Sequence, residues 1–132
     1  MISPMDRFAM ALILIVAFQH VGFFILETFL WQKPIGLKIS RLDAAKAAIT
    51  APLAANQGVY NAFLAAGLFW GLSIALGQGL GYLEFARRIE TFFLCCVVIA
   101  GIVGGMTVNR RIMAVQSLPA AAALFVMWLA AV

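Results

Sequence analysis

The chain has 132 residues, of which 65% are hydrophobic and 11% are charged. Soluble domains have about 45–50% apolar and about 25% charged residues, so this composition excludes an ordinary water-soluble fold. The formal net charge of +4 comes from scattered basic residues, which favours contact with anionic lipid over binding of nucleic acid.

The apolar residues form four runs, each long enough to cross a bilayer as a helix. A hydrocarbon core of about 30 Å needs about 20 helical residues. The runs lack the alternation typical of strands. We therefore predict a single transmembrane domain over residues 1–132, with spans at about 8–31, 53–77, 91–108 and 112–132. The predicted fold class is an all-α polytopic membrane protein, a four-transmembrane-helix bundle with a short amphipathic segment in the first loop.

The first run contains polar residues that are costly in lipid. His20 lies near its middle, Glu27 follows seven residues later, and Trp31 four residues after that. These steps keep all three on one helical face. The helical rise places Glu27 about 10 Å from His20 along the axis. Ionisable residues in membrane helices usually face the protein interior or a wet cavity, so His20 and Glu27 are candidate functional residues.

The first loop is the longest connection between the runs. Ser40 is suited to cap a short helix from Arg41 to about Thr50, with Asp43 in its first turn. Pro52 would then lie near the start of the second span. We expect this segment to lie along the membrane surface.

The second run begins with a cluster of polar residues. Gln57 and Asn61 are four residues apart and share a face, while Asn56 and Tyr60 form an adjacent stripe. Counted from the membrane edge, Gln57 lies about 6 Å inside, at a depth similar to that of Glu27. The two runs therefore place polar groups at one level.

The remaining runs add polar groups on the same side. After a second loop that includes the charged stretch 84–90, Thr107 and Asn109 close the third run, and Gln116 lies just inside the fourth. We expect a polar pocket in one half of the bundle, with His20 near mid-membrane as its floor.

Each polar residue also has a purely structural interpretation. Asn and Gln side chains join membrane helices through hydrogen bonds of roughly 0.6–2 kcal/mol. Trp31 and Tyr60 would suit interfacial anchors, and His20 a core position. The pairs Gly67/Gly71 and Gly101/Gly105 have the spacing of close helix packing.

The positive charges predict an orientation. Four crossings place both termini on one side, and the first and third loops on the other. Those two loops carry six basic residues against three on the opposite side, which favours cytoplasmic loops one and three with both termini outside. The six are Lys33, Lys38, Arg41, Lys46, Arg110 and Arg111.

Several motifs resemble the bacterial membrane-protein family catalogued as domain of unknown function 1304, over nearly the whole chain. They are His20 with Glu27 and Trp31, the stretch 55–65 that contains Asn-Gln-Gly-Val-Tyr-Asn, residues 100–102 with Gly104 and Thr107, and Gln116 with residues 119–120. Val103 departs from the aromatic residue, usually Tyr, expected in similar proteins. The resemblance implies a four-helix protein of the bacterial inner membrane and supplies no activity.

Three functions remain open. The first is a protein that binds or converts a small lipophilic molecule, with His20 and Glu27 as acid and base acting through a common ligand. Its ligand-binding residues would be Trp31, Asn56, Gln57, Tyr60, Asn61, Thr107 and Gln116. The second is a proton-coupled transporter or channel component working as a homo-oligomer, and the third is a non-catalytic accessory protein. We expect membrane lipids as partners, and neither a cofactor nor a metal, because His20 and Glu27 alone are too few ligands.

Overall fold

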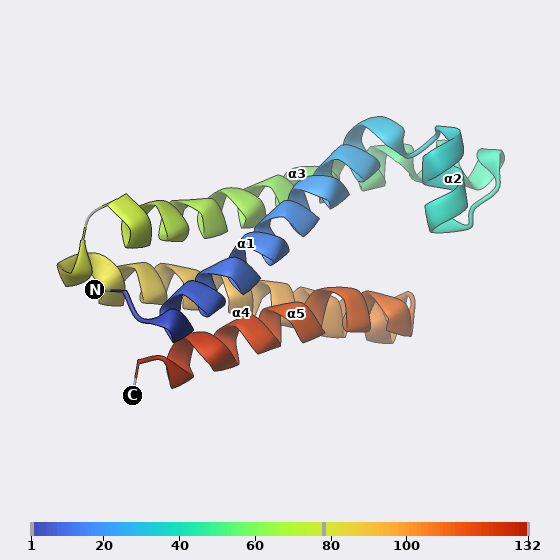
Figure 1. Ribbon diagram of the computed structural model, residues 1–132. Coiled ribbons are helices and arrows are strands. Elements are labelled where there is room, and N and C mark those ends of the chain that lie inside the picture. Colours follow the sequence, from blue (N-terminus) through green and yellow to red (C-terminus); the bar gives the residue numbers. More distant parts are fainter. Residues whose placement is uncertain (1, 78, 132) are drawn as a thin grey trace. The chain divides into compact units, whose positions relative to one another are not determined.

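The computed structural model describes residues 2–77 and 79–131, and over these residues the chain is helical without strands (Figure 1). Four helical stretches are long and apolar enough to cross a membrane. They are Pro4–Leu30, Ala44–Gly77, Leu83–Thr107 and Arg110–Leu129. The predicted fold class, an all-α polytopic membrane protein, is confirmed.

Large apolar side chains on every long helix face outward. Phe18, Phe63, Ile99 and Phe125 are each more than half exposed. A water-soluble monomer rarely shows apolar surface on this scale, whereas lipid solvates it at no cost. The exposed residues thus agree with the composition in requiring a lipid surround.

The chain divides into two compact units. Unit 1 consists of Met1–Ala17 and Ala66–Val132, and unit 2 consists of Phe18–Ala65. Helix α1 (Pro4–Ile25) and helix α3 (Ala44–Gly77) are each divided between the two units.

Unit 1 contains the pair α4 (Leu83–Thr107) and α5 (Arg110–Leu129), which run side by side (Figure 1). Glycines on α4 permit the close approach. A Cβ added at Gly101 would collide with Ser117 Oγ, and one at Gly105 would lie 2.5 Å from Met113 Cβ. Ser117 Oγ also donates a hydrogen bond to the Val98 carbonyl at 2.9 Å. The glycine spacing thus serves helix packing, as the sequence predicts.

Helix α4 begins earlier than the apolar run suggests. It starts at Leu83 after a short 3-10 turn, η2 (Leu80–Tyr82), so the stretch 84–90 that we assigned to the second loop is helical. Asn109, assigned to the end of the third run, is the N-cap of α5, and its Oδ1 accepts a hydrogen bond from Arg111 N at 2.9 Å. The Asn109 side chain therefore determines where α5 begins.

Unit 2 contains the second part of α1, the π-helix η1 (Leu26–Leu30), the short helix α2 (Pro34–Ser40) and the first part of α3. Helix α2 packs directly on the preceding turn. A Cβ at Gly36 would collide with the Leu30 carbonyl oxygen and lie 2.5 Å from that of Trp31. Only glycine fits this contact.

The first loop does contain a short helix, but its limits differ from our prediction of Arg41–Thr50. Ser40 ends α2 instead of starting a helix, and Arg41 follows in the left-handed conformation with φ 60°. Asp43 accepts a hydrogen bond from Lys46 N at 2.8 Å, which caps α3. From Ala44 the helix then continues through Pro52 to Gly77, because the alanine-rich first turns are strong helix formers.

Candidate functional site

The end of the first span is a π-helix. Residues Leu26–Leu30 form this wider turn directly after α1, and Glu27 is its second residue. Such turns are rare, and they occur frequently at functional sites because the extra residue redirects side chains. The regular helical spacing that we assumed for His20, Glu27 and Trp31 therefore does not extend past Ile25.

Glu27 meets Asn61 inside unit 2. Asn61 Nδ2 donates to Glu27 Oε2 at 2.7 Å and lies 3.3 Å from the Gln57 carbonyl oxygen. Asn61 is 4% exposed, whereas Glu27 is half-buried. Within the described part of the chain, Glu27 Oε1 forms no hydrogen bond, so it can meet a ligand.

Gly58 allows this meeting by removing a side chain between the two helices. A Cβ at Gly58 would collide with Thr28 Oγ1 and lie 3.2 Å from both Glu27 Cβ and the Phe24 carbonyl oxygen. The backbone of α3 therefore lies directly against the π-helix. This explains a glycine between the polar residues of the Asn-Gln-Gly-Val-Tyr-Asn stretch.

Trp31 is fixed on the same side of unit 2. Its Nε1 donates to Thr50 Oγ1 at 3.0 Å, and Thr50 Oγ1 in turn donates to the Lys46 carbonyl at 2.8 Å. The indole thus spans from the end of η1 to the first turns of α3. Its hydrogen bond leaves the ring faces for apolar contact.

A pocket of about 270 Å³ opens beside the π-helix. Its walls come from η1, the turn after it and α3, so it lies wholly within unit 2. The lining residues are Glu27, Thr28, Phe29, Trp31, Gln32, Lys33 and Ala51. Thr28 Oγ1 is buried and has no hydrogen-bond partner among the described residues. The pocket therefore combines polar groups with aromatic walls.

The structure brings together only part of the predicted site. Glu27 and Asn61 form a direct pair, and Trp31 lines the pocket beside Glu27. His20 is 1% exposed, contacts Phe23 edge-on at 5.4 Å between ring centroids, and does not line the pocket.

The other predicted ligand-binding residues lie elsewhere. Asn56, Gln57 and Tyr60 are exposed on α3. Thr107 and Gln116 belong to unit 1, where Thr107 Oγ1 donates to the Val103 carbonyl at 2.8 Å. Gln116 packs over Gly101, with its Cβ 2.9 Å from the position of an added Cβ.

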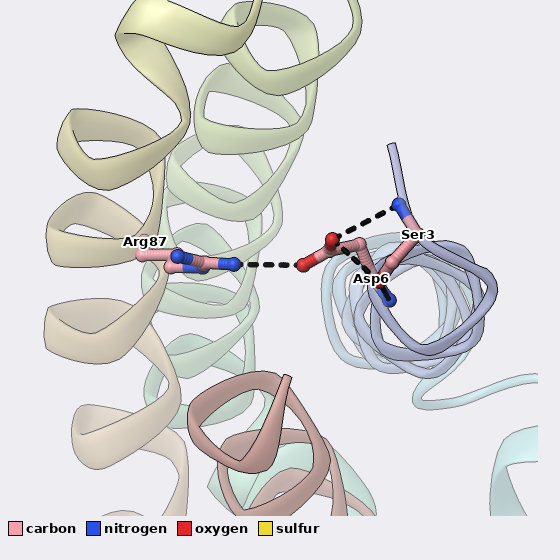
Figure 2. A network of polar contacts seen from close by, with 3 residues as sticks. All are labelled: Ser3, Asp6 and Arg87. Atoms are coloured by element: carbon pink, nitrogen blue, oxygen red, sulfur yellow. Dashed lines mark hydrogen bonds and ion pairs between the residues drawn. The ribbon is translucent and has the colours of Figure 1, made fainter. Parts of the chain in front are cut away.

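Unit 1 contains polar residues that the sequence reasoning passed over. Figure 2 shows Asp6 Oδ1 accepting a hydrogen bond from Arg87 Nη2 at 2.8 Å, while Asp6 Oδ2 accepts from Ser3 Oγ at 2.7 Å. Asp6 N donates back to Ser3 Oγ at 3.1 Å, which forms a capping box before Pro4. The signal was present in the sequence as Ser-Pro-Met-Asp.

Glu90 is the second such residue. We assigned it to the second loop, yet it is 3% exposed on α4. The α-helical continuation of the apolar pattern back to Leu83 would have revealed it.

The sequence comparisons identify the family. The profile described as "Protein of unknown function (DUF1304)" matches residues 14–128, so the chain belongs to this family. The matched range includes the whole of unit 2. Neither the curated proteins nor the solved structures yielded a match.

Proposed function

We propose that this member of the DUF1304 family binds a small lipophilic molecule with one hydrogen-bonding group in the pocket of unit 2. The observation that carries the proposal is the half-buried Glu27 at a π-helix, oriented by Asn61 and facing a pocket with aromatic walls. Placing a carboxyl group in a membrane-spanning helix costs free energy, and such groups usually serve a function.

The lining defines the ligand chemistry. The Glu27 carboxyl group favours a ligand with a hydroxyl or amine group, because its oxygens can accept a hydrogen bond from that group. Phe29, Trp31 and Ala51 favour an apolar remainder. At about 270 Å³ the pocket is slightly smaller than the range of about 300–1,000 Å³ that holds drug-sized ligands. The ligand should accordingly be small.

Binding is favoured over conversion by the position of His20. An acid–base pair needs both groups within reach of one ligand, and His20 is buried outside the pocket lining. Glu27 alone supports binding and, at most, a single proton transfer.

The proposal also includes a location. The family resemblance implies the bacterial inner membrane, and the loop charges favour an orientation with the first and third loops in the cytoplasm. Because Gln32 and Lys33 of the first loop line the pocket, the ligand would then enter at the cytoplasmic side.

Tryptophan fluorescence tests the proposal. In a Trp70→Phe, Trp128→Phe background, Trp31 is the remaining tryptophan. A medium-chain alcohol with a terminal bromine should quench it saturably, and the corresponding brominated alkane should quench it only weakly. Since a hydrogen bond to a charged group contributes about 1.5–3 kcal/mol, Glu27→Gln should weaken alcohol binding about tenfold.

The matched control is Glu84→Gln on the exposed surface of α4 in unit 1, which should leave quenching unchanged. Equal quenching by alcohol and alkane, together with no effect of Glu27→Gln, would contradict a polar ligand site at Glu27. Size-exclusion profiles of all variants establish that each protein is folded.

A further inference from the structure

Glu90 of α4 is a buried carboxyl group that the proposed ligand site does not use. It lies in unit 1, is 3% exposed and is five residues from Cys95, the middle of α4. That distance is about 8 Å along the helix, within the half-thickness of about 15 Å of a hydrocarbon core. A bilayer centred on α4 would therefore enclose Glu90, which is also buried inside the protein.

A glycine on α3 makes room for this side chain. A Cβ added at Gly71 would lie 2.5 Å from Glu90 Cγ and 3.3 Å from both its Cδ and its Oε1. The carboxyl group thus lies against bare helix backbone. Glu90 Oε1 is buried and has no hydrogen-bond partner within residues 2–77 and 79–131.

The nearby cation is already paired. Arg87, one turn before Glu90 on α4, forms its ion pair with Asp6 of α1 at 2.8 Å (Figure 2). Both side chains of that pair are nearly buried, at 13% and 11% exposed. Asp6 is further held by hydrogen bonds from Ser3 N and Oγ. Asp6 and Arg87 therefore neutralise each other.

No ion pair among the described residues includes Glu90, and the side chain of Arg7 on α1 is exposed. The part of α3 in unit 1, residues 66–77, contains no ionisable side chain, and the ionisable side chains of α5 are Arg110 and Arg111 at its first turn. Glu84 and Arg88 on α4 pair with each other at the exposed surface. An ionised Glu90 would leave one uncompensated negative charge, which is strongly unfavourable in a buried site.

We propose that Glu90 is a proton-binding site of unit 1, a neutral carboxyl group that holds an exchangeable proton within the membrane. The ligand is the proton itself. Its release would leave Arg87 as the nearest cation, so Arg87 would be drawn from Asp6 toward Glu90. The proposal is independent of ligand binding in unit 2.

Lipid-soluble carbodiimides test this protonation directly. A protonated carboxyl group adds across one N=C bond of the reagent, and the acylisourea rearranges to a stable acylurea with no atom lost and no redox change. The full-length protein in native membranes is treated with dicyclohexylcarbodiimide at neutral pH and mapped by peptide mass spectrometry. We expect one adduct at Glu90, absent in Glu90→Gln.

Alkaline pH should slow labelling about tenfold per pH unit once the carboxyl group ionises. Glu84, exposed on the same helix, is the matched control: it should react with a water-soluble carbodiimide, and Glu84→Gln should leave the Glu90 adduct unchanged. Protection of Glu90 by sodium chloride but not by potassium chloride would overturn the proposal in favour of a metal-cation site.

Infrared spectroscopy supplies a readout that needs no reagent access. The difference spectrum of wild type minus Glu90→Gln should show a protonated-carboxyl band at neutral pH that disappears in alkali. If a carboxylate band is lost instead, Glu90 is ionised and the proposal is wrong. The spectrum thus distinguishes a protonated Glu90 that the reagent cannot reach from a Glu90 that is ionised.

Discussion

Substitution of Gly58 by alanine tests the close contact on which the candidate site depends. The new methyl group would meet Thr28 Oγ1, Glu27 Cβ and the Phe24 carbonyl oxygen. Thr28 can rotate its hydroxyl away. The other two atoms, each 3.2 Å from the added Cβ, can move only if the last turn of α1 and the π-helix move.

Two opposing effects set the magnitude. Replacing glycine by alanine within a helix stabilises it by about 0.5–1 kcal/mol. Overpacking against a well-packed neighbour typically costs about 1–3 kcal/mol. Gly22→Ala on α1 is a matched control in the same unit, because nothing lies within 4 Å of its added Cβ. Since the helix effect is common to both, the two variants should differ by about 1–3 kcal/mol.

The assay is unfolding of the purified protein in mixed micelles with increasing dodecyl sulfate, followed by circular dichroism. Gly58→Ala should unfold at a lower denaturant fraction than wild type, and Gly22→Ala at the same or a higher one. The same variant should weaken alcohol quenching of Trp31, because a displaced π-helix moves Glu27 away from Asn61. If Gly58→Ala is as stable as Gly22→Ala, the inferred helix contact is wrong.

Four further substitutions test other contacts. Asn61→Ala should lower the free energy of unfolding by about 0.6–2 kcal/mol in the same assay. A double-mutant cycle with Glu27→Gln should show coupling, and strict additivity would argue against the hydrogen-bonded pair. Asp6→Asn should destabilise the protein by up to about 3 kcal/mol because its ion pair is largely buried. Glu84→Gln breaks an exposed pair and should change stability by at most about 0.5 kcal/mol, so equal losses would refute the distinction. Gly101→Leu should lower the melting temperature in detergent, since α5 packs on that glycine; an unchanged melting temperature would contradict this contact.

The sequence also predicted part of the candidate site. Glu27 and Asn61 were singled out because each is costly in lipid. Helical rise also placed the polar groups at the end of the first run and at the start of the second run at similar depth in the membrane. The structure joins them by a hydrogen bond. Helical rise does not determine which residue of a polar stripe faces its partner, and thus Asn56, Gln57 and Tyr60 were selected although they are exposed.

Composition and apolar run length by themselves determined that this protein is helical, with four segments long and apolar enough to cross a membrane. Hydropathy is a sum over neighbours in sequence, so it needs no knowledge of packing. Only the tertiary structure decided that Leu26–Leu30 forms a π-helix, that Gly58 lies against it and that Glu90 is buried over Gly71. Those features depend on which helix supplies the facing surface. The packing energy of a side chain against a backbone that is distant in sequence cannot be derived from the residues next to it in the chain.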